Sequence, residues 1–181
     1  YHFASRGNRR SKYETNSFTD NPEWEKINVN STKNFIRKWG TINLHDEYLK
    51  PRKPSKYKIG FKVKNCTYQL LELLEPWCDT IHTDLSASEA DRYISTEQPN
   101  TLFNLSQRVL TSIIVYKVKA GIDIYVEIDG NHFTQIDFEH IQQLSEILTD
   151  SGEIGTMQLG NLIIDIKALN HYEQELIICN H

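Results

Sequence analysis

Residues 57–64 alternate between apolar and mostly basic side chains, without an exception across the segment. The apolar set is Tyr57, Ile59, Phe61 and Val63, and the intervening set is Lys58, Gly60, Lys62 and Lys64. Because successive side chains of a strand point to opposite faces, this period of two predicts a strand with one buried face and one basic face. The fold must therefore contain a sheet, and other elements must cover its apolar face.

The residues that follow predict a βαβ unit that begins with this strand. Leucines at 70, 71 and 74 form a helical stripe, which Asn65 or Thr67 can cap and which Pro76 stops. Residues 78–84 then form a second short strand with polar residues at its end. Parallel strands joined in this way need a crossover connection, which is expected to be right-handed.

Asn65, His82 and Asp84 lie at the ends of these two strands and form a candidate nucleotide pocket. The carboxyl ends of parallel strands share one edge of a sheet, and open sheets bind ligands beyond that edge. No glycine-rich phosphate loop follows residues 57–64, however. The alternative is that these residues only cap the helix that follows each strand.

The second half of the chain predicts two hairpins with a helix between them. Residues 113–118 and 122–128 form the first hairpin, and residues 156–159 and 162–166 form the second. Helices are expected at about 101–110 and 135–149, and a further helix starts at Ser86 or Ser88. The predicted fold class is α+β, a mixed sheet with one βαβ unit and two hairpins, helices mainly on one face and a basic helical extension in front.

A second candidate site, for a metal ion, lies at the end of the strand at 122–128. Glu127 and Asp129 share a strand face, and His132 follows the glycine turn at Gly130. Carboxylate and imidazole groups are common metal ligands. The alternative is that these residues bind no metal, because acidic side chains are common on the solvent face of a strand and Gly-Asn is a common turn pair.

Charge is distributed unevenly along the chain, although the net charge is only −4. Residues 1–64 carry 15 Lys and Arg against 6 Asp and Glu, and the remaining residues carry 5 against 18. A basic front can meet the phosphates of a nucleotide sugar, an anionic membrane surface, or the acidic part of its own chain. The basic residues at 9, 10 and 12 lack interleaved aromatic residues, which argues against nucleic-acid binding.

Composition narrows the cellular setting. No apolar run approaches the ~20 residues that span a bilayer, and no segment has the pattern of a signal peptide. Cys66, Cys78 and Cys179 are too few and too irregularly spaced for a disulfide framework or a zinc site. A reducing, cytoplasmic location is therefore expected.

The front of the chain predicts a short helix at about 31–39 and then a linker. Asn28, Asn30 or Ser31 can cap this helix, and Gly40 suits its C-terminal cap. Phe35, Ile36 and Trp39 form its apolar stripe, with Trp39 as the anchor, while Lys33, Arg37 and Lys38 face elsewhere. Two prolines among basic residues at 41–56 indicate a linker. The chain is thus divided into an extension at 1–50 and an accessory domain at 57–181.

The opening run Tyr1-His2-Phe3-Ala4-Ser5-Arg6, together with Asn34-Phe35-Ile36-Arg37-Lys38-Trp39-Gly40, resembles the tail of a GT-A-type glycosyltransferase catalytic domain of the family 2 kind. Ala4 stands where that family usually has Gly, and Phe35-Ile36 stands for its aromatic pair. The resemblance covers about the first quarter of the chain. It implies that His2 binds a divalent metal, Mn or Mg, at the diphosphate site, and that Ser5 and Arg6 contact phosphate.

Three functional hypotheses follow. The first is the C-terminal fragment of a glycosyltransferase, which would use a nucleotide-sugar donor and an unknown acceptor through an N-terminal half. That fragment would be inactive alone and hold no metal of its own, because the family's Asp-x-Asp motif does not occur in these residues. The second is a noncatalytic interaction or assembly domain, with a basic arm that docks onto another protein or onto a second copy. The third is a small nucleotide-binding enzyme.

Overall fold

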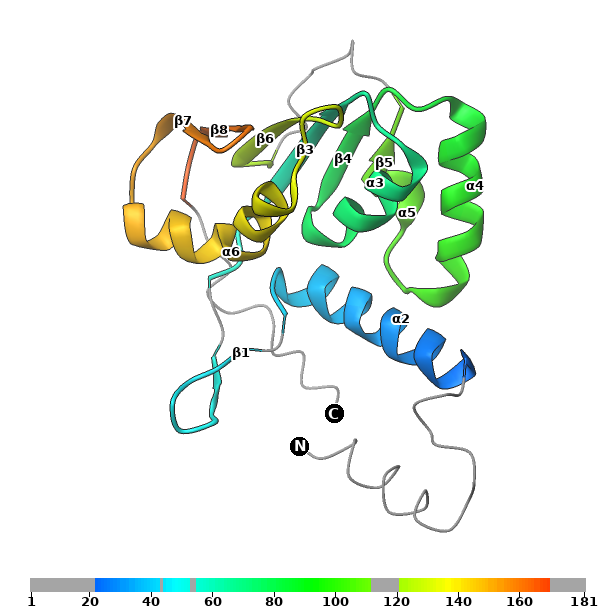
Figure 1. Cartoon of the computed structure of the whole chain (residues 1–181), viewed down its shortest axis with the longest axis horizontal. Helices are drawn as coiled ribbons and strands as arrows, with labels where there is room; N and C mark the ends of the chain where they lie inside the picture. The colour runs from blue at the N-terminus through cyan, green and yellow to red at the C-terminus, as the bar shows by residue number, and fades with distance from the viewer. Residues whose placement is uncertain (1–21, 43, 53–54, 112–120, 170–181) are drawn as a thin grey trace.

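The computed structural model describes residues 22–42, 44–52, 55–111 and 121–169. These residues form an α+β fold around a six-stranded mixed sheet of order β5-β4-β3-β6-β8-β7, as predicted (Figure 1). Its strands are β3 (Ile59–Lys64), β4 (Thr80–Thr83), β5 (Val109–Leu110), β6 (Ile124–Asp129), β7 (Gly155–Leu159) and β8 (Leu162–Ile166). The helices are α2 (Pro22–Trp39), α3 (Tyr68–Leu74), α4 (Ala87–Glu97), α5 (Leu105–Arg108) and α6 (Gln135–Ser151), with 3-10 turns η2 (Glu75–Trp77) and η3 (Gln98–Asn100).

The parallel half of the sheet is centred on β3. This strand pairs in parallel with β4 on one side and with β6 on the other, and β4 pairs in parallel with β5. Strand β3, helix α3 and strand β4 are therefore the predicted βαβ unit. The carboxyl ends of β3, β4 and β6 lie at the same edge of the sheet.

The antiparallel half contains the second predicted hairpin. Strands β7 and β8 pair antiparallel around the turn at Gly160 and Asn161, and β8 pairs antiparallel with β6. The first predicted hairpin is not formed at β6, because the two neighbours of β6 are β3 and β8. Residues 112–120, its other half, lie outside the described residues.

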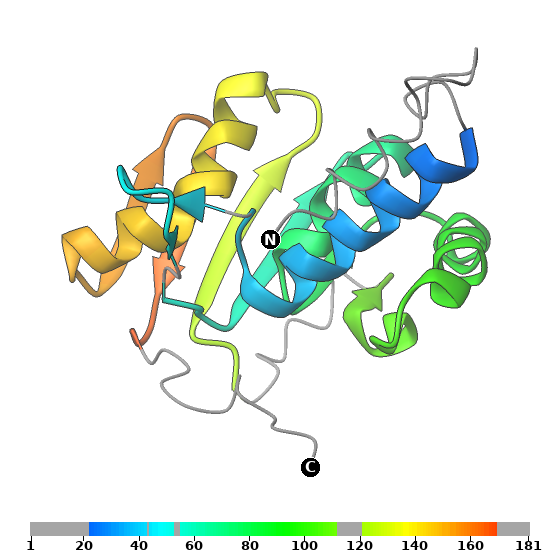
Figure 2. The ribbon, with the colours of Figure 1, turned by 90° about the horizontal axis from the view of Figure 1, so that it is seen from below.

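Alternation along β3 places the apolar set against the helices, as predicted. Phe61 and Val63 are 0% exposed, and Phe61 lies in register with Ile81 of β4 and Val126 of β6. Helices α3 and α6 cover this face, as the two perpendicular views show (Figures 1 and 2). On the other face, Lys62 pairs with Glu127 across the strands at 2.8 Å.

Side-chain caps fix the starts of three helices. Thr67 accepts a hydrogen bond from the Leu70 amide at the start of α3. Ser86 with Glu89, and Thr134 with Asp137, form capping boxes at α4 and α6. Gly152 then ends α6 in the left-handed conformation that an αL cap requires.

The prediction of a helix at about 101–110 is wrong at both ends of the segment. Only Leu105–Arg108 is helical, and Val109–Leu110 belongs to β5. Leu102 is fully exposed, so it does not belong to the apolar stripe that suggested a longer helix. The spacing of Leu102, Leu105 and Val109 fits a helix by coincidence.

Helix α2 differs from its prediction in length and in orientation. It begins at Pro22, so Asn28, Asn30 and Ser31 lie inside the helix and do not cap it. Gly40 follows it with a φ of 71°, which agrees with the predicted C-terminal cap. Its buried residues are Ile36 and Arg37, so Arg37, which was expected to face away from the apolar stripe, is as deeply buried as Ile36 of that stripe.

The predicted linker contains a small hairpin that projects from the body (Figure 1). Strands β1 (Leu44–His45) and β2 (Pro51–Arg52) pair antiparallel. The Asp46 carboxylate accepts hydrogen bonds from the amides of Tyr48 and Lys50 and so holds the turn. Residues 53 and 54 lie outside the described residues.

Candidate functional site

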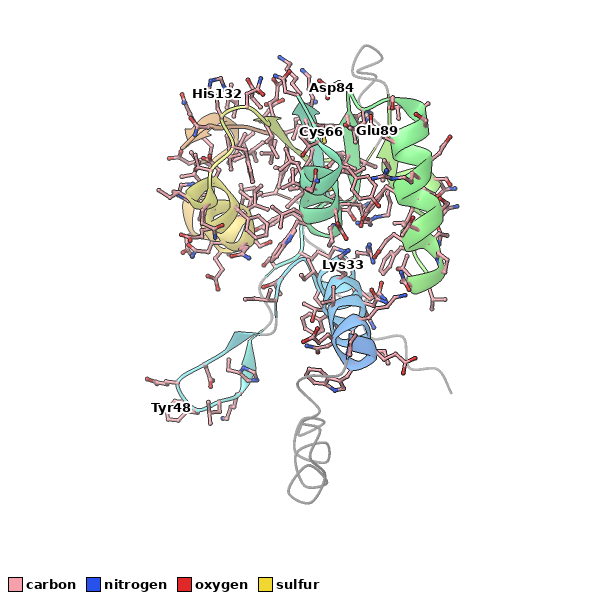
Figure 3. All side chains as sticks on the ribbon, turned by 45° about the vertical axis from the view of Figure 1, so that its right-hand side comes forward. Lys33, Tyr48, Cys66, Asp84, Glu89 and His132 are labelled. Atoms are coloured by element: carbon pink, nitrogen blue, oxygen red, sulfur yellow. The ribbon has the colours of Figure 1, made fainter. Side chains whose placement is uncertain are left out.

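Asn65, Asp84, Asp129 and His132 gather at the carboxyl edge of the parallel strands, and we call them the edge cluster. Asn65 follows β3, Asp84 follows β4, Asp129 ends β6, and His132 lies in the turn after β6. Figure 3 shows Asp84, Cys66 and His132 on the side of the sheet away from α2. Sequence reasoning had placed these residues in two separate candidate sites.

Hydrogen bonds tie Asp84 to the chain that leaves β3. Its two carboxylate oxygens accept from the amides of Asn65, at 2.6 Å, and Cys66, at 2.9 Å. Asn65 has a φ of 51°, a left-handed conformation that Asn tolerates better than most residues. Asp84 thus fixes the turn between β3 and α3, whereas the N-caps of α3 and α4 are Thr67 and Ser86.

The Asn65 side chain links the two candidate sites directly. Its Nδ2 donates to Asp129 Oδ1 at 2.8 Å, and this bond is the first cause of a pKa below the usual range for Asp129. Gly130 permits the approach, because a Cβ at that position would overlap the Asn65 carbonyl oxygen. The strands β3 and β6 are therefore joined through their carboxyl ends as well as along their length.

The predicted metal ligands are only partly brought together. His132 Nδ1 lies 3.1 Å from Asp129 Oδ2, whereas Glu127 pairs with Lys62. Within the described ranges, no group of three His, Cys, Asp or Glu side chains has a metal-binding arrangement. His82 is buried in β4, in register with Lys62 and two residues before Asp84.

The edge cluster and the adjacent Cys66 offer carboxylates, an exposed imidazole and a thiol, but no activated nucleophile. Burial raises the pKa of the Cys66 thiol to about 11, so the reactive thiolate is scarce at neutral pH. The carboxylate oxygens of Asp84 and Asp129 accept hydrogen bonds from nearby amides of the same chain. These hydrogen bonds give the cluster a structural role, which is to hold the ends of the strands in place.

A second charged cluster, at the opposite end of the sheet, is buried. We call it the Glu75 network, and it consists of Arg37 of α2, Glu75 of η2, Tyr93 and Glu97 of α4, and Arg108 of α5. Glu75 is 0% exposed and Arg37 is 1% exposed. Four elements that are distant in sequence therefore meet at one carboxylate.

The Glu75 carboxylate receives donors on both oxygens. Arg37 Nη2 lies 2.6 Å and Nε 2.9 Å from Oε2, and the Tyr93 hydroxyl donates to the same oxygen at 3.0 Å. Arg108 Nε donates to Oε1 at 2.6 Å. Arg37 Nη2 also donates to Glu97 at 2.9 Å. This arrangement satisfies the condition under which a buried charge is tolerated, namely pairing with good hydrogen-bond geometry.

The electrostatics of the network favour an ionised Glu75, a charged Arg37 and a neutral Tyr93 hydroxyl. Burial alone would raise the pKa of Glu75, but the charge of Arg108 and the hydrogen bond from Arg37 hold that pKa below its usual value. Burial, and then the Glu75 charge, raise the pKa of Tyr93, so its hydroxyl remains a donor. Arg37 is a permanent cation, and its pKa is raised further by Glu75 despite burial.

Two lysines extend the attachment of α2. Lys33 Nζ lies 3.1 Å from Glu72 and 3.5 Å from Glu97, and Figure 3 shows Lys33 beneath α3. Lys56 Nζ donates to the carbonyl oxygens of Arg37, at 2.9 Å, and Lys38, at 3.2 Å, and so caps the last turn of α2. Burial lowers the pKa of Lys56.

Sequence reasoning missed the Glu75 network. Arg37 lies 38 residues from Glu75 and 60 from Glu97, so no local spacing connects them. A possible signal is the acid inside the predicted apolar helix end, Glu75 before Pro76, because a buried acid needs a cation. His2, Ser5 and Arg6 lie outside the described residues, and Trp39 is half-buried against Phe35 at a centroid distance of 6.3 Å.

Comparison with known proteins assigns the chain to no family. No protein-family model matches the chain, and neither a curated protein nor a solved structure is significantly similar to it. Among the described helices, none is both long and apolar enough to cross a membrane.

Proposed function

We propose that residues 57–181 form a noncatalytic accessory module in the C-terminal part of a nucleotide-sugar-dependent glycosyltransferase. The observation that carries this proposal is the complete burial of Arg37 against Glu75. Arg37 belongs to the segment that resembles the tail of a catalytic domain, and Glu75 belongs to the α+β module. The module thereby anchors the segment through which a catalytic domain would be attached.

The geometry of the edge cluster supports a noncatalytic role. Its acids accept hydrogen bonds from the chain around them, and the neighbouring Cys66 thiol has a raised pKa. In this proposal the donor, the acceptor and a divalent metal belong to the catalytic domain, with His2 as one ligand and with Ser5 and Arg6 near phosphate. The module works in the reducing cytoplasm, where Cys66 and Cys78 stay as thiols.

The native gene product tests the glycosyltransferase part of the proposal. We expect its intact mass to correspond to a few hundred residues more than the 181 described by this sequence. The additional residues upstream of Tyr1 should include an apolar strand that ends in Asp-x-Asp. Donor hydrolysis by that full-length enzyme should then fall in a His2→Ala variant and persist in Lys64→Ala, which changes an exposed strand-end residue. A native chain without the upstream motif would refute the attachment to a catalytic domain.

A small nucleotide-binding enzyme is the second candidate. One observation favours it: Asn65, Asp84 and Asp129 converge at the carboxyl ends of β3 and β6. From these two neighbouring strands the chain continues towards opposite ends of the strand order, which is where open sheets bind ligands. Calorimetric titration of the 181-residue chain with UDP and Mn²⁺ decides between the two. The accessory-module proposal expects no saturable binding, and binding that is lost in Asp84→Asn would establish the second candidate.

A further inference from the structure

The outer side of α2 carries an apolar stripe. Trp24, Ile27 and Phe35 are 42%, 64% and 37% exposed. Positions 24, 27, 31, 35 and 38 are separated by three or four residues and so lie on one face of the helix. In Figure 2, where the molecule is seen from below, no described helix or strand lies in front of α2.

The Phe35 end of this stripe lies opposite the side chains that attach α2 to the module. Lys33 and Arg37, which pair with Glu72, Glu75 and Glu97, are each about 160° from Phe35 around the helix, and about 120° and 80° from Ile27. The Glu75 network therefore fixes the helix and presents the stripe outward. Aromatic residues on a rigid helix are typical of the centre of a protein interface.

The charges of α2 select the orientation of a partner. The first turn is acidic, with Glu23 and Glu25, and the exposed charge of the last turn is Lys38, since Arg37 is buried against Glu75 and Glu97. Two copies of α2 in antiparallel orientation bring each acidic end to the partner's basic end. A parallel pair would instead place like charges together, which is unfavourable.

The side chains on the stripe are also self-complementary in the antiparallel orientation. A two-fold axis at Ser31 sets each Ile27 opposite the other copy's Phe35, and each Trp24 opposite the other copy's Lys38. Ser31 is small and exposed, so the two helices can approach closely at the axis. Such an isologous contact, with one patch facing its own copy, is the geometry of most protein homodimers.

We propose that this chain forms a homodimer through an antiparallel α2–α2 contact centred on Ser31. The partner is a second copy and not an anionic lipid surface, because Glu23 and Glu25 flank Trp24 and would be repelled by lipid phosphates. The contact goes beyond the proposed function and does not depend on it. One helix pair lies at the small end of interface sizes, so we expect a weak dimer whose population rises with protein concentration.

Sedimentation velocity of the 181-residue chain over a concentration series tests the dimer. Ile27→Glu and Phe35→Glu should each weaken dimerisation by at least about tenfold. Ile136→Glu is the matched control, because Ile136 is 62% exposed on α6, and it should leave dimerisation unchanged. A wild-type chain that stays monomeric across the series, or a dimer that survives Ile27→Glu, would overturn the proposal.

A charge exchange tests the orientation separately from the apolar contact. Lys38→Glu should weaken the dimer, and adding Glu23→Lys to it should restore most of the lost affinity, because each antiparallel pair regains opposite charges. Failure of the double variant to recover, with its circular dichroism unchanged, would refute the antiparallel arrangement. Binding of the wild-type chain to phosphatidylserine vesicles, lost in Ile27→Glu, would assign the stripe to a membrane surface instead.

Discussion

The Glu75 carboxylate has no contact with solvent, and its surroundings determine what a substitution there can do. Replacing Arg37 by Met keeps much of the side-chain volume but removes its three hydrogen bonds to Glu75 and Glu97, so that Arg108 alone remains as the charged donor to the buried Glu75. Breaking a buried ion pair from one side costs about 3–5 kcal/mol. We therefore expect Arg37→Met to lower the free energy of unfolding by that amount in urea titrations followed by fluorescence.

The neighbouring residue provides the control for this measurement. Lys38 is exposed on the same helix turn, and Lys38→Met should change the free energy of unfolding by less than about 0.5 kcal/mol. If the two variants proved equally stable, Arg37 would contribute no more than a surface charge. The burial of the Glu75 network would then have no energetic consequence.

Asp137 gives a prediction about pH. Burial would raise its pKa, but hydrogen bonds from the side chain and amide of Asn161 and from Thr134 lower it to about 2. Because the folded pKa lies below the unfolded value of about 3.9, the carboxylate stabilises the fold above pH 4. That contribution, about 2 kcal/mol, is lost as pH falls from 4 towards 2.

Denaturant titrations between pH 6 and pH 2 test this contribution in the wild type and in Asp137→Asn. The wild type should be more stable at pH 6, and the two curves should converge at the acid end. A constant difference across the range would show that the effect of the substitution is steric and not due to ionisation.

Local sequence patterns found the residues that act within one element and missed those that act between elements. Thr67 and Ser86 were predicted as caps because a cap lies next to the turn it serves. Arg37 was only expected to face away from the apolar stripe, because charged residues are seldom buried unless they are paired. Its acceptors come from η2 and α4, and only the tertiary fold brings them together.

At the scale of elements, Gly160 connects the β7–β8 hairpin to the start of α6. A Cβ at Gly160 would lie 2.5 Å from Asp137 Oδ1, and the residue has a φ of 60°. Gly152 has the same φ, but a Cβ there would meet nothing within 4 Å. Comparison of the two alanine variants therefore separates the steric clash from the backbone cost.

Gly152→Ala should cost about 1–2 kcal/mol, the strain of a left-handed alanine. Gly160→Ala should cost about 1–3 kcal/mol more, because Asp137 must move from its cap position. Thermal unfolding followed by circular dichroism measures both. Equal losses of stability in the two variants would mean that the hairpin turn moves at no cost and that its contact with α6 is not tight.

Elements with a strong and long pattern were predicted well, and short ones were not. The period of two at β3 and the spacing of α6 each had a single interpretation. Helix α5 covers only four residues, too few for a period to be recognised. The edge cluster was predicted as two sites, because only the parallel pairing of β3 with β6 brings Asn65 to Asp129.

At the scale of the whole molecule, the question is whether α2 folds as an arm or as part of the sheet module. The sequence suggested a division near residue 50, based on prolines and a change in charge. The ion pairs of Lys33 and Arg37, and the cap from Lys56, favour a single cooperative unit. Amide hydrogen exchange separates these alternatives, because each cooperative unit opens with its own free energy.

We expect amides at 34–39 to exchange only through global unfolding, with a free energy within about 1 kcal/mol of Phe61 and Val126 in the sheet. Their exchange should also share the same dependence on urea, since both would report the same opening. Amides at 24–30 serve as the internal reference, because few contacts hold that half of α2, and they should exchange faster. If residues 34–39 instead exchanged with a small urea dependence and a lower free energy than Phe61, α2 would be a separable arm, and the division near residue 50 would be correct.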